Sequence, residues 1–358
     1  MRVDDATPAE QPAGQRGGAR ALGRDGGRAI RGWAPLQAGG DGPLAAAGGS
    51  PRTDLAVEAV QRPRRVDGVD VEEGREGEVS VTRVRVRSDE AERVVGKPRG
   101  TYVTLDAPGL LRRDTAVQEQ VARVLARELG ALLPLDAESH IFVVGLGNWN
   151  ATPDALGPRV VSEVLVTRHL AGQVPDDLSG QVRRVSALAP GVLGLTGIET
   201  GEIIRGIVAR IQPDAVVVVD ALASRSVERL GRTIQVADSG IQPGSGVGNH
   251  RSGIDAQSIG VPVVAVGVPT VVHAATIAAD TIDLLAAELD GQPAYAGLHL
   301  LHGEEKRQLI ARVLAPAVGD LMVTPKEIDL LLEDLSGVVA AGINAALHPK
   351  IAARESLL

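Results

Sequence analysis

Two aspartates follow apolar runs, at positions where chemistry could take place. Asp154 stands in GLGNWNATPDALGP, and Asp220 ends the valine run of DAVVVVDAL. Ligands of open α/β sheets bind beyond the carboxyl ends of the strands, so we expect both side chains on loops facing one crevice. Two close carboxylates cannot both ionise cheaply, and one then keeps a proton. Such a pair supplies the acid and the base needed to activate water against an amide.

Each aspartate also has a structural interpretation. Asp154 precedes Gly157 and Pro158 and could cap the helix that begins there. Asp220 could be a buried carboxylate paired with Arg225, and burial would raise its pKa. The sequence leaves both alternatives open.

Glycine-rich segments near these aspartates match no nucleotide-binding motif. Gly145 and Gly147 begin a dinucleotide-type loop, but Asn150 stands where its third glycine belongs, so we expect only a tight turn. Residues 238–249 (DSGIQPGSGVGN) lack the Lys-Ser/Thr ending of a P-loop. Pro243 replaces the first glycine of a nucleophile elbow. This stretch could form an anion nest, although a rigid loop that walls a cleft is favoured.

Composition narrows the class of protein. The 358 residues are 44% hydrophobic but only 1% aromatic, so the core must be built from Val, Leu, Ile and Ala. The net charge of -8 argues against nucleic-acid binding. Without Cys or an HExxH motif, and with few scattered His, we expect no metal site and no other cofactor. No apolar run of spanning length and no signal peptide is evident, which predicts a cytoplasmic protein without a membrane partner.

The hydrophobic pattern predicts an α/β fold with a mainly parallel central sheet flanked by helices. A phase slip near Thr82 and Arg83 indicates a bulge in the first strand. Thr115 with Gln118, and Thr324 with Pro325 and Glu327, are typical of helix starts. The expected strands lie at 78–86, 101–107, 140–148, 214–222 and 261–270, and the expected helices at 114–133, 158–171, 198–211, 270–289, 303–314 and 325–347.

The first part of the chain differs from the rest. Residues 1–50 hold 12 of the 43 glycines and show no periodicity. This composition is typical of a disordered leader, or of a start codon assigned too far upstream. We therefore predict a leader and propeptide over residues 1–54 and a single domain over residues 55–358.

Longer motifs resemble the germination protease of spore-forming bacteria. They are VVGLGNWNATPDALGP, VLVTRHL, APGVLGLTGIETGEIIRGIV, DAVVVVDALASRS, TIQVADSGIQPGSGVGN, GVPVVAVGVPTVV, DTIDLL and LMVTPKEIDLLLEDLSGVVAAGINAALH. The resemblance runs from about Arg52 to about His348. It implies an atypical aspartic endopeptidase whose fold is similar to that of hydrogenase-maturation endopeptidases. It further implies a homotetramer in the forespore or spore core that degrades small acid-soluble spore proteins during germination.

The resemblance also assigns roles to residues. The family's proposed catalytic aspartates match Asp154 and Asp220. Gln242 stands where the family usually has His, and His273 where it usually has Asp, which puts in doubt a catalytic role for those two positions.

The segment RTDLAVEA matches the site at which the family's zymogen cuts itself. The resemblance therefore implies cleavage between Asp54 and Leu55. The family's substrates carry a similar order: acidic, large apolar, Ala, small, Glu. We expect this bond on an accessible extended segment, because the glycine-rich leader precedes it. A linker with an accidental match is the structural alternative.

Two rival functions remain from the sequence. One is a metal-dependent peptidase or maturation factor on the same fold. The other is a non-catalytic phosphate or nucleoside binder that uses residues 238–249.

Overall fold

The computed structural model describes residues 53–60, 66–170, 172, 182–243, 253–289, 309–310, 312–313, 321–349 and 351. The predicted leader, apart from Thr53 and Asp54, lies outside this part of the chain. So does most of the helix expected at 303–314.

Nine strands of the described chain form one mixed sheet in the order β1-β2-β3-β7-β8-β6-β4-β5, with β9 paired to β8. Strands β8, β6, β4 and β5 run parallel, and the others pair antiparallel. The predicted α/β class is confirmed. The parallel half contains all three central strands expected from their apolar runs. The strands are β1 (Val69–Glu76), β2 (Val79–Val86), β3 (Gly100–Asp106), β4 (His140–Gly145), β5 (Arg184–Leu188), β6 (Ala215–Ser224), β7 (Thr233–Ala237), β8 (Val263–His273) and β9 (Met322–Val323).

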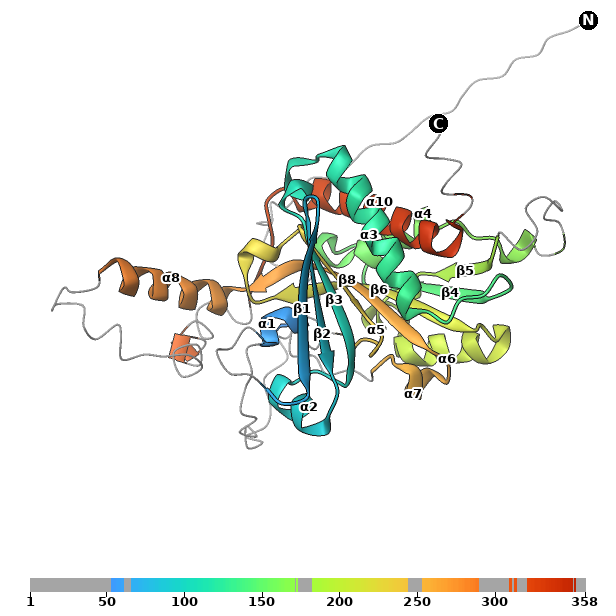
Figure 1. Ribbon diagram of the computed structural model, residues 1–358, viewed down its shortest axis with the longest axis horizontal. Coiled ribbons are helices and arrows are strands. Elements are labelled where there is room, and N and C mark those ends of the chain that lie inside the picture. The colour runs from blue at the N-terminus through green and yellow to red at the C-terminus, as the bar shows by residue number, and fades with distance from the viewer. Residues whose placement is uncertain are drawn as a thin grey trace, which may run out of the picture. The chain divides into compact units, whose positions relative to one another are not determined.

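Helices cover both faces of the sheet (Figure 1). On one face, α3, α4 and α10 pack against all the central strands. On the other face, α6 and α7 cover the parallel half, while α1 and α2 cover the antiparallel half. The α-helices are α1 (Ala56–Val60), α2 (Asp89–Val95), α3 (Thr115–Leu132), α4 (Leu156–Glu163), α5 (Leu193–Thr196), α6 (Thr200–Ile211), α7 (Ala256–Ile259), α8 (Ala274–Glu288) and α10 (Ile328–Leu347). Short 3-10 turns are η1 (Pro108–Arg112), η2 (Thr152–Asp154), η3 (Arg168–Leu170) and η4 (Val227–Arg229).

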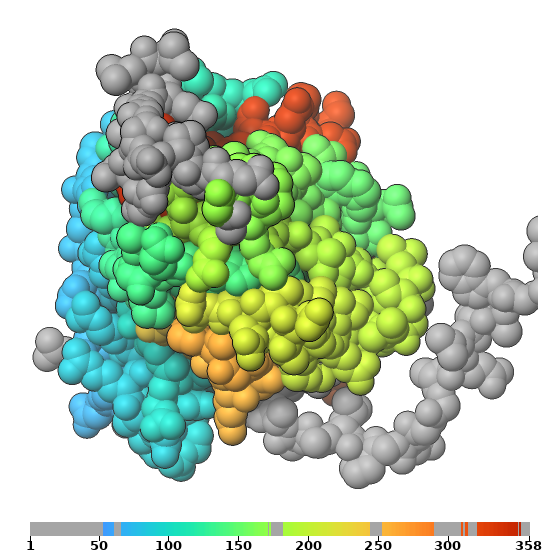
Figure 2. Space-filling model, turned by 90° about the vertical axis from the view of Figure 1, so that its right-hand side faces the viewer, coloured from blue at the N-terminus to red at the C-terminus, as the bar shows by residue number. Residues whose placement is uncertain are grey.

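Figure 2 shows the molecule from the side. Residues around 190–215, drawn yellow-green, and residues near 70–105, drawn blue, lie on opposite sides of this view. Because aromatic side chains are scarce, this core consists of small aliphatic side chains. Phe142 of β4 is the single Phe of the chain and is fully buried beneath α6.

Helix α10 is long and apolar enough to cross a membrane by composition alone. In the structure it packs against α3 and α4. Its buried residues belong to the main core: Ile328, Leu332, Leu335, Val338, Val339, Ala340, Ile343 and Leu347. A core helix of a globular domain has the same composition, so the helix is explained by this packing.

Strand β2 changes its buried face without a bulge. Its register with β1 and with β3 is continuous, so the predicted bulge near Thr82 and Arg83 is wrong. Val79 and Val81 face α3, whereas Val84 joins the cluster beneath α1 and α2. The phase slip arises because different helices cover the two ends of one strand on opposite faces.

Several predicted element boundaries are corrected by the local hydrogen bonds. Asp114, not Thr115, caps α3, because its Oδ1 accepts from the backbone N–H of Ala116 at 3.1 Å and of Val117 at 3.3 Å. Thr324 does not cap α10, because its hydroxyl donates to the carbonyl of Thr270 at 2.9 Å.

The predicted starts of α8 and α10 are corrected as well. Strand β8 continues through His273, so α8 begins only at Ala274. Helix α10 begins at Ile328, with Glu327 as a cap that makes no side-chain bond.

Glu128 links α3 to the antiparallel half of the sheet. Its carboxylate accepts from Arg83 Nε at 3.0 Å and from Arg127 Nη2 at 2.6 Å, and the residue is buried. Burial opposes ionisation, but the hydrogen bonds and charges of the two arginines outweigh it and lower the pKa of Glu128. A lowered folded-state pKa stabilises the fold above the unfolded-state pKa, and this contribution is lost as the pH falls through the folded-state value.

We predict that Glu128→Gln lowers the free energy of unfolding by about 1–3 kcal/mol at pH 7, because Arg83 loses a charged partner. Urea denaturation at several pH values measures this difference, which should shrink in acid. Glu119→Gln is the matched control, since Glu119 pairs with Arg123 on the exposed face of the same helix at 3.6 Å and should leave stability nearly unchanged. A pH-independent difference between Glu128→Gln and the parent would contradict the ion-pair explanation.

Candidate active site

Asp154 ends η2, and its carboxylate is engaged by the preceding loop. The backbone N–H of Asn148 donates to Asp154 Oδ2 at 2.8 Å and to the Asp154 carbonyl at 3.1 Å. Ala155 is the capping residue of α4 and makes no side-chain bond. The interpretation of Asp154 as a helix cap is therefore wrong, because its carboxylate turns back toward the loop after β4.

Glycine at position 147 permits this close approach. Gly147 has φ +115, and a Cβ at this position would lie 2.0 Å from the Asp154 carbonyl oxygen. No L side chain fits such a contact or readily adopts this conformation. The tight turn predicted for the Gly145–Gly147 loop is confirmed, and its effect is to set the position of Asp154.

Asp220 lies inside β6 rather than at its end. The strand continues to Ser224, so the prediction that Asp220 follows the strand on a loop is wrong. Asp220 is 7% exposed, stands opposite Gly267 of β8, and accepts from the backbone N–H of Ala221 at 2.9 Å. The strand extends because residues 221–224 go on pairing with β8. Arg225, the partner proposed from the sequence, lies 3.9 Å from Asp280.

A bulge in β8 links η2, which holds Asp154, to the part of the sheet next to β6, which holds Asp220. The register shifts between Leu222 and Ala223, which leaves Thr270 of β8 as the extra residue. The Thr270 hydroxyl is buried and donates to the carbonyl of Pro153 at 2.7 Å. Sequence reasoning missed this residue, since a bulge in an all-apolar strand leaves no break in the pattern.

The structure thus brings the segments of both aspartates to one edge of the sheet. Turn η2 contacts both β6 and β8. The backbone N–H of Leu146, just after β4, donates to the carbonyl of Val219 at 2.8 Å, one residue before Asp220. Two carboxyl groups from these segments are suitable for acid and base work on a peptide bond.

Trp149 is exposed on the loop that holds Asp154. It follows Asn148, whose backbone N–H donates to Asp154 and whose side-chain Oδ1 accepts from the backbone N–H of Asn150 at 3.0 Å. Trp149 is 57% exposed in a chain with two Trp.

Segment 53–60 is docked in the body of the domain. Leu55 and Ala56 are 0% exposed, and α1 begins directly after Leu55. The prediction that the Asp54–Leu55 bond lies on an accessible extended segment is wrong. Leu55 is buried because it packs with Val57 and Leu222 in a small apolar cluster.

Backbone and amide groups hold the chain on both sides of this bond. Gln235 Nε2 donates to the Asp54 carbonyl at 3.0 Å, and Gln235 Oε1 accepts from the N–H of Ala56 at 2.7 Å. Asp54 N donates to the carbonyl of Ala223 at 2.9 Å, while Ala223 N donates to Asp54 Oδ2 at 2.8 Å. These four hydrogen bonds to β6 and β7 hold the chain on both sides of the bond, while the N–H of Leu55 donates to the Thr53 hydroxyl at 3.1 Å.

Glu58 is the charged anchor of the segment. Its carboxylate accepts from the backbone N–H of Arg225 at 2.8 Å and of Ser226 at 3.0 Å, and Arg229 Nε lies 3.4 Å away. The Thr53 hydroxyl donates to the same carboxylate. Glu58 is only 5% exposed, and burying a carboxylate is costly unless it is paired and hydrogen-bonded in this way.

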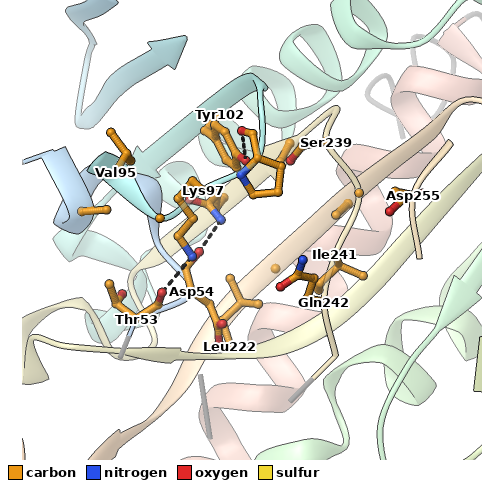
Figure 3. A pocket seen from close by; sticks show the side chains of 18 residues that line it. Thr53, Asp54, Val95, Lys97, Tyr102, Leu222, Ser239, Ile241, Gln242 and Asp255 are labelled. Atoms are coloured by element: carbon orange, nitrogen blue, oxygen red, sulfur yellow. Dashed lines mark hydrogen bonds between the residues drawn. The ribbon is translucent and has the colours of Figure 1, made fainter. Parts of the chain in front are cut away.

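A cavity of about 320 Å³ opens beside the docked segment. Lys97, Tyr102 and Gln242 line it, together with Asp54 and Gly267, which stands opposite Asp220. Figure 3 shows Lys97 beside Thr53 and Asp54, with Gln242 and Asp255 across the cavity.

Lys97 is the cation of this cavity wall. Its Nζ donates to the Thr53 carbonyl at 2.8 Å. Burial lowers the pKa of Lys97, and the charges of Asp54 and Glu58 act in the opposite sense. Nothing in the sequence pattern around GKPRG had singled out this lysine.

Gln242, His273 and the loop after Asp238 are the remaining positions that the sequence singled out. Gln242 lines the cavity, and His273 is buried at the end of β8. Residues 244–249 of the predicted cleft loop lie outside the described residues. Within the described ranges, no group of three or more His, Cys, Asp or Glu is placed to hold a metal ion.

Comparison with solved structures finds a likeness to the [NiFe] hydrogenase maturation protease HycI from Thermococcus kodakarensis. The two are 18% identical, with a TM-score of 0.30, over 60% of this chain and 97% of that one.

Curated relatives are much more similar in sequence. The germination protease of Caldanaerobacter subterraneus subsp. tengcongensis is 52% identical over 312 residues, which cover 85% of this chain and 96% of that protein. The germination protease of Clostridium acetobutylicum is 48% identical over 319 residues, covering 86% and 98%. That of Bacillus mycoides is 42% identical over 348 residues, covering 84% and 95%.

The family model for germination protease matches residues 52–294 and 292–357. The match includes the docked segment, both aspartates and every described strand. The chain therefore belongs to the germination protease family.

Proposed function

We propose that this chain is an aspartate-dependent endopeptidase that initiates the degradation of small acid-soluble spore proteins during spore germination. Its work is done in the spore core, and no direct nucleic-acid or membrane partner is part of the proposal. The observation that carries it is the family match across the whole folded domain, which includes Asp154 in η2 and Asp220 in β6. The chain belongs to a family of spore proteases, and the proposal adds the substrate class and the catalytic residues.

In the proposed mechanism, one aspartate holds a proton and the other takes one from water. The water oxygen attacks the carbonyl carbon, and the protonated aspartate donates to the leaving nitrogen. Burial of Asp220 in β6 and the anchoring of Asp154 by Asn148 keep the two groups in place during this exchange.

We further propose that the enzyme is made as a zymogen that cuts its own Asp54–Leu55 bond. This proposal is supported by the match between Asp54–Glu58 and the substrate order of the family. Because Leu55 is buried, the segment must first leave its site by local opening. The docked state then protects the bond, and its stability sets the rate of processing.

We also propose a homotetramer. Leu284 and Leu285 of α8 are exposed, and these side chains are suitable for an apolar contact between copies. Helix α8 extends away from the sheet in Figure 1, where a second copy can reach it.

The test of the function is incubation of the purified chain with a small acid-soluble spore protein, followed by mass spectrometry of the fragments. We predict that Asp154→Asn and Asp220→Asn each lower the rate of cleavage by about 10²–10⁴-fold while leaving the circular dichroism spectrum unchanged. A chelator should have no effect on the parent enzyme. Turnover near the parent rate in either variant would falsify the assignment of that aspartate.

We predict that Thr270 acts by positioning the Asp154 turn. Thr270→Val removes the hydroxyl that holds Pro153 and should lower kcat by about 10–100-fold with a smaller effect on KM, since displaced catalytic groups act mainly on the chemical step. Thr324→Val is the matched control, because its hydroxyl bonds the Thr270 carbonyl and does not touch η2. Equal loss of activity in both variants would mean that only local stability matters here.

We predict that the full-length chain shortens itself to begin at Leu55, as N-terminal sequencing will show. Gln235→Ala should raise the rate about tenfold, because two hydrogen bonds that dock the segment are lost and opening becomes easier. Asp220→Asn is the control and should stay full length. Cleavage at another bond, or slower processing in Gln235→Ala, would show that the docked state does not protect this bond.

A further inference from the structure

Glu58 is linked to the nitrogen of the Asp54–Leu55 bond through one hydroxyl group. The Thr53 hydroxyl stands between them, since it accepts from the N–H of Leu55 at 3.1 Å and donates to Glu58 Oε2. The nitrogen of Leu55 is thus one hydroxyl away from a carboxylate that is almost fully buried.

The proposed cleavage changes this arrangement chemically. Hydrolysis breaks the C–N bond, the water oxygen joins the carbonyl carbon of Asp54, and the two water hydrogens complete an ammonium at Leu55. The α-amino group has an ordinary pKa of about 7.7–8.0 and is mostly charged at neutral pH. Thr53 and Asp54 leave with the leader.

Two hydrogen-bond acceptors each lose one partner when the leader leaves. Glu58 loses the Thr53 hydroxyl, and the carbonyl of Ala223 loses the N–H of Asp54. Glu58 is one hydroxyl away from the Leu55 nitrogen, and the Ala223 carbonyl accepts from the residue directly before Leu55. Leu55 and Ala56 remain attached through the apolar cluster and through Gln235 Oε1, so the new terminus stays close to them.

We propose that Glu58 and the Ala223 carbonyl form a receptor for the α-ammonium of Leu55, which replaces the Thr53 hydroxyl after processing. This inference rests on the proposed cleavage site. An ammonium has three donors and can satisfy both vacated acceptors. A buried charge is tolerated when it is paired and hydrogen-bonded, and the carboxylate is already fixed by the N–H groups of Arg225 and Ser226.

Lys97 must respond to the same event. It loses the Thr53 carbonyl and the neighbouring charge of Asp54. Because its side chain lines the cavity, it can turn into the space that the leader vacates.

The receptor can bind the new amine only if cleavage occurs at the bond before Leu55. One extra residue would displace the amine by about 3.3–3.6 Å and leave Glu58 without its new partner. Only a chain that begins at Leu55 then replaces the donors that Glu58 and the Ala223 carbonyl have lost.

The test generates the terminus without relying on self-processing. The full-length chain carries Asp220→Asn and the factor Xa recognition sequence Ile-Glu-Gly-Arg at positions 51–54, and factor Xa cuts before Leu55 in dilute urea that is then removed. The control chain carries that sequence at positions 50–53 with Asp54→Gly, so that its cut leaves one additional glycine. An amine-reactive acetylating reagent at neutral pH is followed by mass spectrometry of the N-terminal peptide.

We predict that Leu55 is acetylated at least about tenfold more slowly than the glycine-extended terminus, since pairing that raises the amine pKa by one unit lowers its reactive neutral fraction tenfold. Glu58→Gln in the Leu55 chain should restore fast labelling. Equal rates at the two termini overturn the receptor, and this comparison holds even where Glu58→Gln fails to fold. Failure of the unmodified chain to process itself would instead refute the cleavage proposal and leave this measurement intact.

Discussion

Strand β6 is the constraint on which the site depends. It lies between β4 and β8 in parallel register and is buried along nearly its whole length. A strand covered on both faces can satisfy its backbone groups only through its neighbours, so its position is fixed by both ladders. The position of Asp220 is therefore fixed by the strand. The residues just beyond it, from Leu222 to Ser226, contact segment 53–60.

The docked segment packs in the domain and also shields the peptide bond that we propose is cleaved. The side chains of Leu55 and Glu58 contribute to the packing of the domain, and the peptide bond between Asp54 and Leu55 is shielded by the same contacts. In the proposed processing the bond is exposed by local opening of this segment, which is held by a few hydrogen bonds, by the cluster around Leu55 and by the packing of Ala56 and Ala59 with Ala237 of β7. The stability of a short segment can therefore be adjusted separately from that of the domain.

The sequence predicted the parallel strands because their signal is local: continuous valine runs indicate buried strands. The same runs led to Asp154 and Asp220 as candidates, and their catalytic roles stay a prediction. The sequence could not show that β6 extends past Asp220, since Ala221–Ser224 carries no strong pattern and is held by pairing with β8. It likewise missed Thr270 and Gln235, and it placed Glu58 in the cleavage motif without showing its contacts with Arg225 and Ser226, because these contacts join segments far apart in the chain. The apparent bulge in β2 had the same origin, because two different helices determine which of its faces is buried.

Because aromatic side chains are scarce, the exposure of Trp149 has a consequence for the tryptophan fluorescence of the protein. Trp33 lies outside the described residues, so Trp149 is the indole that the structure places, and it is largely exposed on the loop that holds Asp154. A solvated indole changes its emission little when an aliphatic core unfolds. An apolar partner that covers the exposed ring shifts its emission to the blue. The fluorescence of Trp149 therefore reports contacts made at this loop better than it reports unfolding.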